Sequence, residues 1–322
     1  MQNDRQYLVE PGEVTRIFRS IYGRDPEPRE LPFIESIIQL NFQTTTDIYR
    51  AILCSLDHQT LKTGFTVRFS EKDVSYVWFR GILFAVDTKD IAVSLPLTQG
   101  IYESHLLSFY ADRLKPGMTF VDIGANIGLY SLFAAHQIGE GGRVLSFEPY
   151  SENCRLILLS LIKNSLKNVM VFPVALSVKT GHAFFTTHIG SNGGLLPENV
   201  SVLSDPSCIV VPTVRLDDFI QEHVDFIKID VEGAEGLVVM GARNLIERDR
   251  PIITSEFSME MLPRVSGITC RDYLGYFKDN HYNIFLIDRD SGSLVSIVDI
   301  DLFLDSFGSI TRIEDLAFIP AE

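Results

Sequence analysis

A carboxylate stands directly before a glycine turn in the stretch FVDIGANIGLYS, residues 120–131. The apolar residues before Asp122 predict a buried strand, and those after Gly128 predict a helix. Gly124 and Gly128 therefore fall in a strand-to-helix turn, where the absent side chains let a ligand approach the backbone. Glu148 follows about 20 residues later at the end of the next apolar segment, where a carboxylate binds ribose hydroxyls in doubly wound folds. Together these residues predict a site for a ligand that contains adenosine.

Two cofactors with an adenosine ribose fit such a site, NAD and S-adenosylmethionine. The spacing G-A-N-I-G lacks the G-x-G-x-x-G fingerprint of dinucleotide sites, and the chain has no P-loop Gly-Lys-Ser/Thr motif. Asp122 would oppose the pyrophosphate of NAD at a helix N-terminus that attracts anions. The ammonium and sulfonium groups of S-adenosylmethionine are cations, and the backbone amides near Asn126 can meet its carboxylate. The sequence therefore favours S-adenosylmethionine.

A second set of acidic residues occurs in IKIDVEGAE, residues 227–235. Asp230 is expected to end a strand over the ligand crevice, because this crevice lies at the carboxyl ends of parallel strands. Glu232 and Glu235 begin the next helix, where carboxylates interact favourably with the helix dipole. A structural role is favoured for Glu235.

Transfer of a methyl group to a hydroxyl depends on in-line positioning, and a base within hydrogen-bonding reach removes the hydroxyl proton. Asp230 and Glu256 both end predicted strands at the crevice and are the leading candidates. His188 lies in a looser insertion at about 181–208 that could bring it over the methyl group. A divalent metal bridging Asp230 and Glu256 is an alternative, but no third ligand is evident, and we predict no bound metal.

The elements that position these residues fall into three predicted parts. Residues 1–60 contain amphipathic helical stretches, and residues 61–98 form a small β region that includes VSYVWFRGILFAV and IAVSL. From residue 99 to residue 322, apolar strands alternate with helices. This alternation predicts a mostly parallel sheet covered by helices on both faces.

Composition limits the partners and the location. The chain has 322 residues, a hydrophobic content of 46% and a net charge of −14. This negative charge repels the phosphate backbone of a nucleic acid, and we therefore do not expect nucleic acid as a partner. The start MQNDRQYLVEPGEV lacks the plan of a signal peptide, and no apolar run approaches the roughly 20 residues that span a bilayer. The four cysteines are scattered without metal-binding spacing. We therefore expect a cytoplasmic protein without a membrane span.

Several ordered segments resemble the FkbM-type S-adenosylmethionine-dependent O-methyltransferases. They are GIYESHLLSFYADRLKPGMTFVDIGANIGLYS, FEPYSEN, LKNVMVFPVALS, RLDDFI, IKIDVEGAE and RPIITSEF. The resemblance implies a Rossmann-like class I methyltransferase fold with a mostly parallel seven-stranded sheet. It also implies a set of cofactor-binding residues: Asp122, Gly124, Ala125, Asn126 and Gly128 in the turn, Glu148 and Pro149 at the ribose, Ala175 and Leu176 at the adenine, and Tyr102 and Glu103 at the methionine end.

The acceptor is less well defined. The acceptors of the family are hydroxyls of sugars or polyketide-like metabolites. The segment IFRSIYGRDPEPREL resembles small helical modules beside bacterial glycan-modifying enzymes, which favours a saccharide; a lid or an oligomerisation element is the alternative for this region. An NAD-dependent oxidoreductase and a non-catalytic S-adenosylmethionine-binding module remain the rival functions.

Overall fold

The computed structural model describes residues 74–87, 90, 93–98, 102–189, 192–197, 207–308 and 312–321. The predicted helical region 1–60 and the first part of the predicted β region lie outside these residues. Within the described ranges, no helix is long and apolar enough to cross a membrane.

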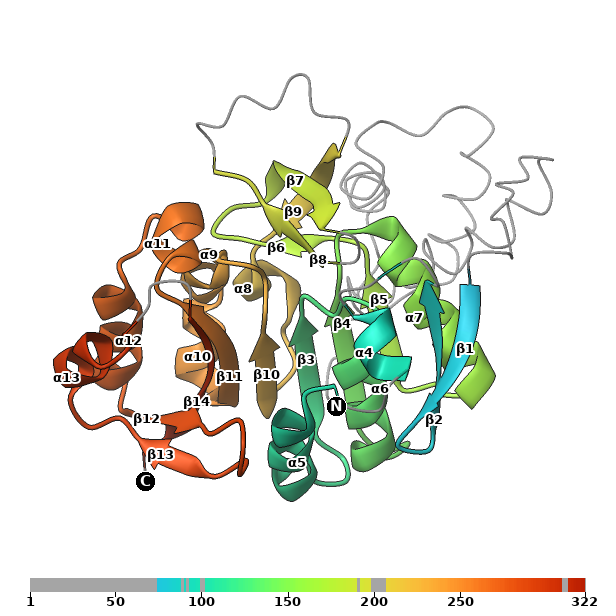
Figure 1. Ribbon diagram of the computed structural model, residues 1–322, viewed down its shortest axis with the longest axis horizontal. Helices are drawn as coiled ribbons and strands as arrows, with labels where there is room; N and C mark the ends of the chain where they lie inside the picture. Colours follow the sequence, from blue (N-terminus) through green and yellow to red (C-terminus); the bar gives the residue numbers. More distant parts are fainter. Residues whose placement is uncertain are drawn as a thin grey trace, which may run out of the picture. The chain divides into compact units, whose positions relative to one another are not determined.

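An eight-stranded sheet forms the centre of the described chain, in the order β13-β12-β14-β11-β10-β3-β4-β5 (Figure 1). Five neighbouring strands are parallel: β5 (Val169–Phe172), β4 (Arg143–Phe147), β3 (Thr119–Ile123), β10 (Phe226–Ile229) and β11 (Ile252–Ser258). The last strand, β14 (Ile313–Pro320), inserts antiparallel between β11 and β12 (Tyr282–Ile287). This arrangement confirms the expected class I methyltransferase fold, to which β13 (Leu294–Ser296) adds an eighth strand at the edge.

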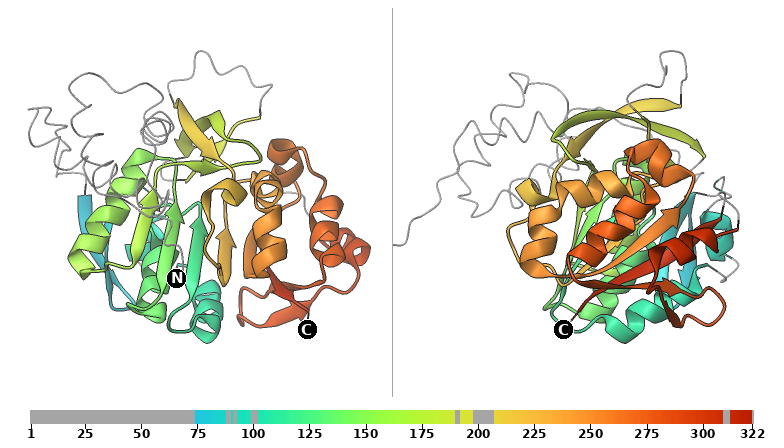
Figure 2. Two further views of the ribbon diagram at one scale, coloured as in Figure 1. Left: turned by 180° about the vertical axis from the view of Figure 1, so that it is seen from behind. Right: turned by 90° about the vertical axis from the view of Figure 1, so that its left-hand side faces the viewer.

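Helices pack on both faces of the sheet (Figure 2). Alternate residues of each strand point to opposite sides, so each face has side chains that contact a helix. In β4, Ser146 faces helix α6 (Leu129–Ile138) and is hydrogen-bonded to Ser131. The next residue, Phe147, points the other way and packs against Phe219 of α8 (Leu216–Phe219). The remaining helices of the sheet region are α5 (Ser104–Arg113), α7 (Ser151–Asn164), α9 (Glu235–Gly241), α10 (Arg243–Asp249), α11 (Met261–Ser266), α12 (Cys270–Asp279) and α13 (Ile300–Asp305).

A hairpin of β1 (Val74–Phe79) and β2 (Ile82–Asp87) packs on α7. The side chain of Asn164 takes the place of a neighbouring strand: its oxygen accepts from the Leu83 N–H at 3.0 Å, and its nitrogen donates to the Leu83 carbonyl at 2.7 Å. The strand predicted at IAVSL is wrong, because Ser94–Thr98 forms helix α4. Asp90 accepts hydrogen bonds from the backbone N–H groups of Val93 and Ser94, which stabilises the start of this helix.

The insertion after β5 is more ordered than the sequence indicated. It forms a second sheet, in the order β6-β9-β7-β8, from β6 (Ala175–Leu176), β9 (Cys208–Val214), β7 (Gly181–Ile189) and β8 (Asn192–Leu195). Phe185, Leu195 and Val211 form an apolar cluster with Ala234, the residue that precedes α9. In Figure 1 this sheet lies beyond the carboxyl ends of the parallel strands, over the region where a ligand is expected.

Candidate active site

A pocket opens at the carboxyl ends of β3, β4 and β10. Its wall brings together eleven of the residues predicted for catalysis or cofactor binding: Tyr102, Glu103, Gly124, Ala125, Asn126, Glu148, Pro149, Ala175, Leu176, Asp230 and Glu256. Phe185, Gly193 and Leu195 of the second sheet also line it. The pocket is therefore bounded by both sheets.

The turn after β3 requires a glycine at position 124 for a reason that the sequence did not reveal. Gly124 has φ +75, and its N–H donates to the Phe147 carbonyl at 2.9 Å. A Cβ at this position would lie 1.8 Å from the backbone oxygen of Asp230. The glycine thus permits a close approach of two chain segments, the turn and the end of β10.

Gly128 lies outside the pocket lining, in contrast to its expected place in the cofactor turn. It precedes α6 with φ +87, and an added Cβ would lie 2.9 Å from Cγ1 of Ile157 in α7. Packing of α6 against α7 therefore accounts for this glycine.

Asp122 also differs from its expected place, because it lies beneath the pocket and is fully buried. The alternation along β3 directs its side chain toward α6, where Ser131 donates a hydrogen bond to Oδ2 at 2.6 Å. Burial raises the pKa of Asp122, while Lys228 and Ser131 counteract part of this rise. Its carboxylate supports the floor of the pocket and does not face the ligand space.

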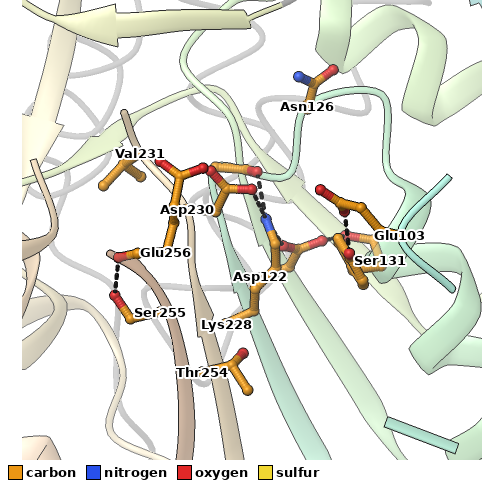
Figure 3. Close-up of polar contacts among 12 residues, drawn as sticks. Glu103, Asp122, Asn126, Ser131, Lys228, Asp230, Val231, Thr254, Ser255 and Glu256 are labelled. Carbon is orange, nitrogen blue, oxygen red and sulfur yellow. Dashed lines mark hydrogen bonds and ion pairs between the residues drawn. The ribbon is translucent and has the colours of Figure 1, made fainter. Parts of the chain in front are cut away.

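The sequence analysis missed Lys228, a buried residue of β10 whose side chain lies between Asp122 and Asp230 (Figure 3). Its ammonium donates to the Gly124 carbonyl at 3.1 Å and lies 3.2 Å from Oδ2 of Asp230 and 3.6 Å from Oδ1 of Asp122. Burial alone would lower the pKa of Lys228, but the carboxylates of Asp230 and Asp122 outweigh it and raise the pKa. A lysine within the otherwise apolar strand FIKI was the available signal.

Glu148 lines the pocket and also holds the backbone around it. Its Oε2 accepts from the Asn126 N–H and its Oε1 from the Tyr150 N–H, both at 2.8 Å. Burial raises the pKa of Glu148 to about 7, although these two hydrogen bonds act in the opposite direction. The Asn153 side chain also hydrogen-bonds to this carboxylate. Since a carboxylate has about four lone-pair sites, one of them is left to accept a hydroxyl hydrogen from a ligand.

Tyr102 and Glu103, at the start of α5, also line the pocket. Glu103 precedes this helix with φ +40, and the Tyr130 hydroxyl donates to its carboxylate. Burial and the nearby Asp230 raise the pKa of Glu103 to about 7. Burial also raises the pKa of the neighbouring Tyr102.

A further group of carboxylates lies after β10 and within β11. Glu232 has a pKa raised to about 7 by burial and by Asp230, and burial and Asp230 also raise the pKa of Glu256. Glu235 is not in the lining; it accepts from the N–H groups of Val231 and Gly233, which agrees with its predicted structural role. Among the described residues, no group of three or more His, Cys, Asp or Glu side chains is placed to hold a metal ion.

His188 cannot be assigned to this site. It belongs to β7, but only its backbone is among the described parts of the chain. Its predicted role stays a prediction.

The methyltransferase FkbM domain family matches residues 122–311, which is more than half of the chain, so the protein belongs to this family. A comparison with curated proteins found no match. Among solved structures, methyltransferase FkbM from Methylobacillus flagellatus KT has 15% identity and a TM-score of 0.42 over 95% of this chain and 58% of that chain. The chain thus spans little more than half the length of that protein.

Two further similar structures differ in their stated activities. An rRNA methylase from Streptococcus thermophilus has 12% identity and a TM-score of 0.39, over 67% of this chain and 95% of that chain. A SAM-dependent methyltransferase from Aquifex aeolicus has 15% identity and a TM-score of 0.36, over 67% and 88%.

The close approach at the glycine turn leads to a first prediction. Gly124→Ala should destabilise the chain more than Gly117→Ala, a matched control with φ +87 and no atom within 4 Å of an added Cβ. The control should cost about 1–2 kcal/mol for the left-handed backbone alone. Overlap with the Asp230 carbonyl should add about 1–3 kcal/mol, the usual cost of overpacking. Urea unfolding measures both values, and equal losses would show that the turn tolerates the side chain.

Proposed function

We propose that the protein is an S-adenosylmethionine-dependent O-methyltransferase that methylates a hydroxyl of a small molecule, with a saccharide as the favoured acceptor. One observation carries this proposal: in a chain of the FkbM methyltransferase family, Glu148 and the Gly124–Asn126 turn line one pocket at the carboxyl ends of β3 and β4. In doubly wound folds this is where an adenosine ribose binds.

Other lining residues suit the adenine and methionine parts of the cofactor. Ala175 and Leu176 line the same pocket as Glu148 and offer apolar contacts to an adenine ring. Tyr102 and Glu103 line the pocket at the start of α5, and the Glu103 carboxylate suits the cationic methionine end of the cofactor.

The charges of the lining bear on the acceptor. Among the described lining residues, those with a carboxyl group are Glu103, Glu148, Asp230, Glu232 and Glu256, and the one with an amine is Lys228. The ammonium of Lys228 already contacts Asp122, Asp230 and the Gly124 carbonyl. A phosphate of a nucleic acid would find repulsion there, whereas a neutral or cationic acceptor would not. This supports a saccharide hydroxyl over an RNA base as the acceptor.

Bound S-adenosylmethionine would supply an electrophilic methyl group, which the acceptor oxygen attacks as the carbon–sulfur bond breaks. The chain must hold that oxygen in line and accept its proton. Asp230 is the favoured base, because its side chain is one-third exposed at the pocket and Lys228 fixes its carboxylate. Glu256 is the alternative base. Burial raises the pKa of its carboxyl, which favours the protonated form that cannot accept a proton, so Asp230 is preferred.

We also propose that the protein is cytoplasmic and that its N-terminal region contributes to an oligomer. Free thiols at Cys154, Cys208 and Cys270 support a reducing compartment. The N-terminal region lies outside the described residues.

A second prediction tests the ribose contact. Glu148→Gln should weaken binding of S-adenosylhomocysteine, the product form of the cofactor, by about 1–3 kcal/mol, the scale of a hydrogen bond to a charged group. Asp217→Asn is the matched control. Asp217 is also buried and accepts backbone N–H bonds, from Leu245 at 2.9 Å and Asn244 at 3.3 Å, but it is absent from the pocket lining. Calorimetric titration measures both affinities.

The same titrations should depend on pH. Since the pKa of Glu148 lies at about 7 in the folded chain, its carboxylate forms as the pH rises through 7. Affinity of the unaltered protein should therefore increase from pH 6 to pH 8, and Glu148→Gln should reduce this increase. An unchanged affinity and an unchanged pH profile in the variant would remove Glu148 from the cofactor site.

A third prediction concerns the base. Methyl-labelled S-adenosylmethionine and a panel of methyl glycosides would identify an acceptor, on which Asp230→Asn should lower kcat by about 10²–10⁴-fold. Glu256→Gln is the comparison and should have the smaller effect. Activity that survives EDTA would leave no metal for these carboxylates to hold. Near-normal kcat in Asp230→Asn would assign the proton transfer to another group, with Glu256 and His188 the next candidates.

A further inference from the structure

Lys228 is the one cation in the described pocket lining, and it is almost fully buried. It pairs in register with Asp122 of β3, so both side chains point to the same face of the sheet. Its ammonium also lies 5.0 Å from the centre of the Tyr130 ring. Residues from β3, β10 and α6 thus enclose this charge.

Three protein oxygen atoms surround the ammonium. Two belong to the pocket wall: the Gly124 carbonyl at 3.1 Å and Oδ2 of Asp230 at 3.2 Å. The third, Oδ1 of Asp122, lies beneath the pocket at 3.6 Å. The contacts with Gly124 and Asp230 have hydrogen-bond lengths, whereas the separation from Asp122 is that of an ion pair without a hydrogen bond. Lys228 therefore holds two groups of the pocket wall and can affect a ligand through them.

A purely structural account would assign Lys228 to the neutralisation of Asp122, because an unpaired buried carboxylate is strongly destabilising. That account does not require the contact with Asp230, whose side chain is 33% exposed and can be hydrated. It also does not require the bond to the Gly124 carbonyl, since a carbonyl at the pocket wall can bind water. These two contacts point to a role in shaping the site.

We propose that Lys228 is a positioning residue of the cofactor pocket, where its ammonium joins the carbonyl of the glycine turn to the carboxylate of Asp230 and fixes both walls in one geometry. This inference rests on the proposed function, because the ligand whose fit it controls is S-adenosylmethionine. It adds a residue that acts on the turn and on the candidate base together.

The test separates neutralisation of Asp122 from positioning of the pocket. Lys228→Met leaves the buried Asp122 unpaired and should lower the Tm strongly. Lys228→Met combined with Asp122→Asn removes both charges of the pair and should recover most of that Tm. If Lys228 positions the pocket, this double variant should still bind S-adenosylhomocysteine about tenfold more weakly than the unaltered protein, because the contacts with Gly124 and Asp230 remain absent.

Recovery of the affinity together with the Tm in the double variant would overturn the proposal and leave Lys228 with a purely structural role. Lys163→Met is the control for loss of a lysine, since Lys163 lies in α7 over the Tyr76 ring and is absent from the lining; it should leave the affinity unchanged. If the double variant does not fold, Lys228→Leu with Asp122→Asn provides the same comparison, because leucine also has no hydrogen-bond donor. An unaltered protein that binds no S-adenosylhomocysteine would overturn the proposed function, and this inference with it.

Discussion

The negative charge of Asp122, buried between β3 and α6, is the constraint on which the site depends. A carboxylate without solvent must be paired and hydrogen-bonded. Ser131 supplies the hydrogen bond and Lys228 the positive charge. To reach Asp122, the lysine must stand at the paired position of β10. That position also places its ammonium against the glycine turn and Asp230, so the need to pair one buried charge brings two walls of the pocket together.

The loops around the pocket are held by carboxylates that accept backbone N–H groups. Glu148 binds the turn at Asn126 and the chain at Tyr150, and Glu235 binds the segment from Val231 to Gly233. These contacts order the pocket walls without a ligand. A preorganised site loses less conformational entropy when its ligand binds, which suits a reaction whose rate depends on positioning.

Much of the fold could be predicted from the sequence, because alternating apolar strands and helices and the DIGANIG turn leave few arrangements of a parallel sheet. Glu148, Asp230 and Glu256 could be placed at the pocket because the first two directly follow a strand and the third lies near the end of β11. The direction of Asp122 could not, since strand alternation at a turn decides whether a carboxylate faces the ligand or the helix layer. Lys228 was missed because its partner lies on a neighbouring strand, and pairing across the sheet is not visible in a local pattern.

Glycines illustrate the same limit. Gly124 and Gly128 looked alike in the sequence, yet one admits the Asp230 carbonyl and the other admits Ile157 of α7. The second sheet was also missed, since its strands β7 and β8 contain glycine and polar residues that resemble a loop. Phe185 and Leu195 bury their side chains only because β9 and Ala234 complete the cluster. Such contacts depend on residues far apart in the chain.

The central claim is that this pocket binds S-adenosylmethionine and not a dinucleotide. Since Asp122 does not face the pocket and Glu148 suits the ribose of either cofactor, the choice rests on the spacing of the turn and on the carboxylates Glu103 and Glu232 in the wall. Calorimetric titration of the full chain with S-adenosylhomocysteine and, separately, with NAD tests it most directly. The account predicts saturable binding of S-adenosylhomocysteine at one site and none of NAD; binding of NAD without S-adenosylhomocysteine would contradict it.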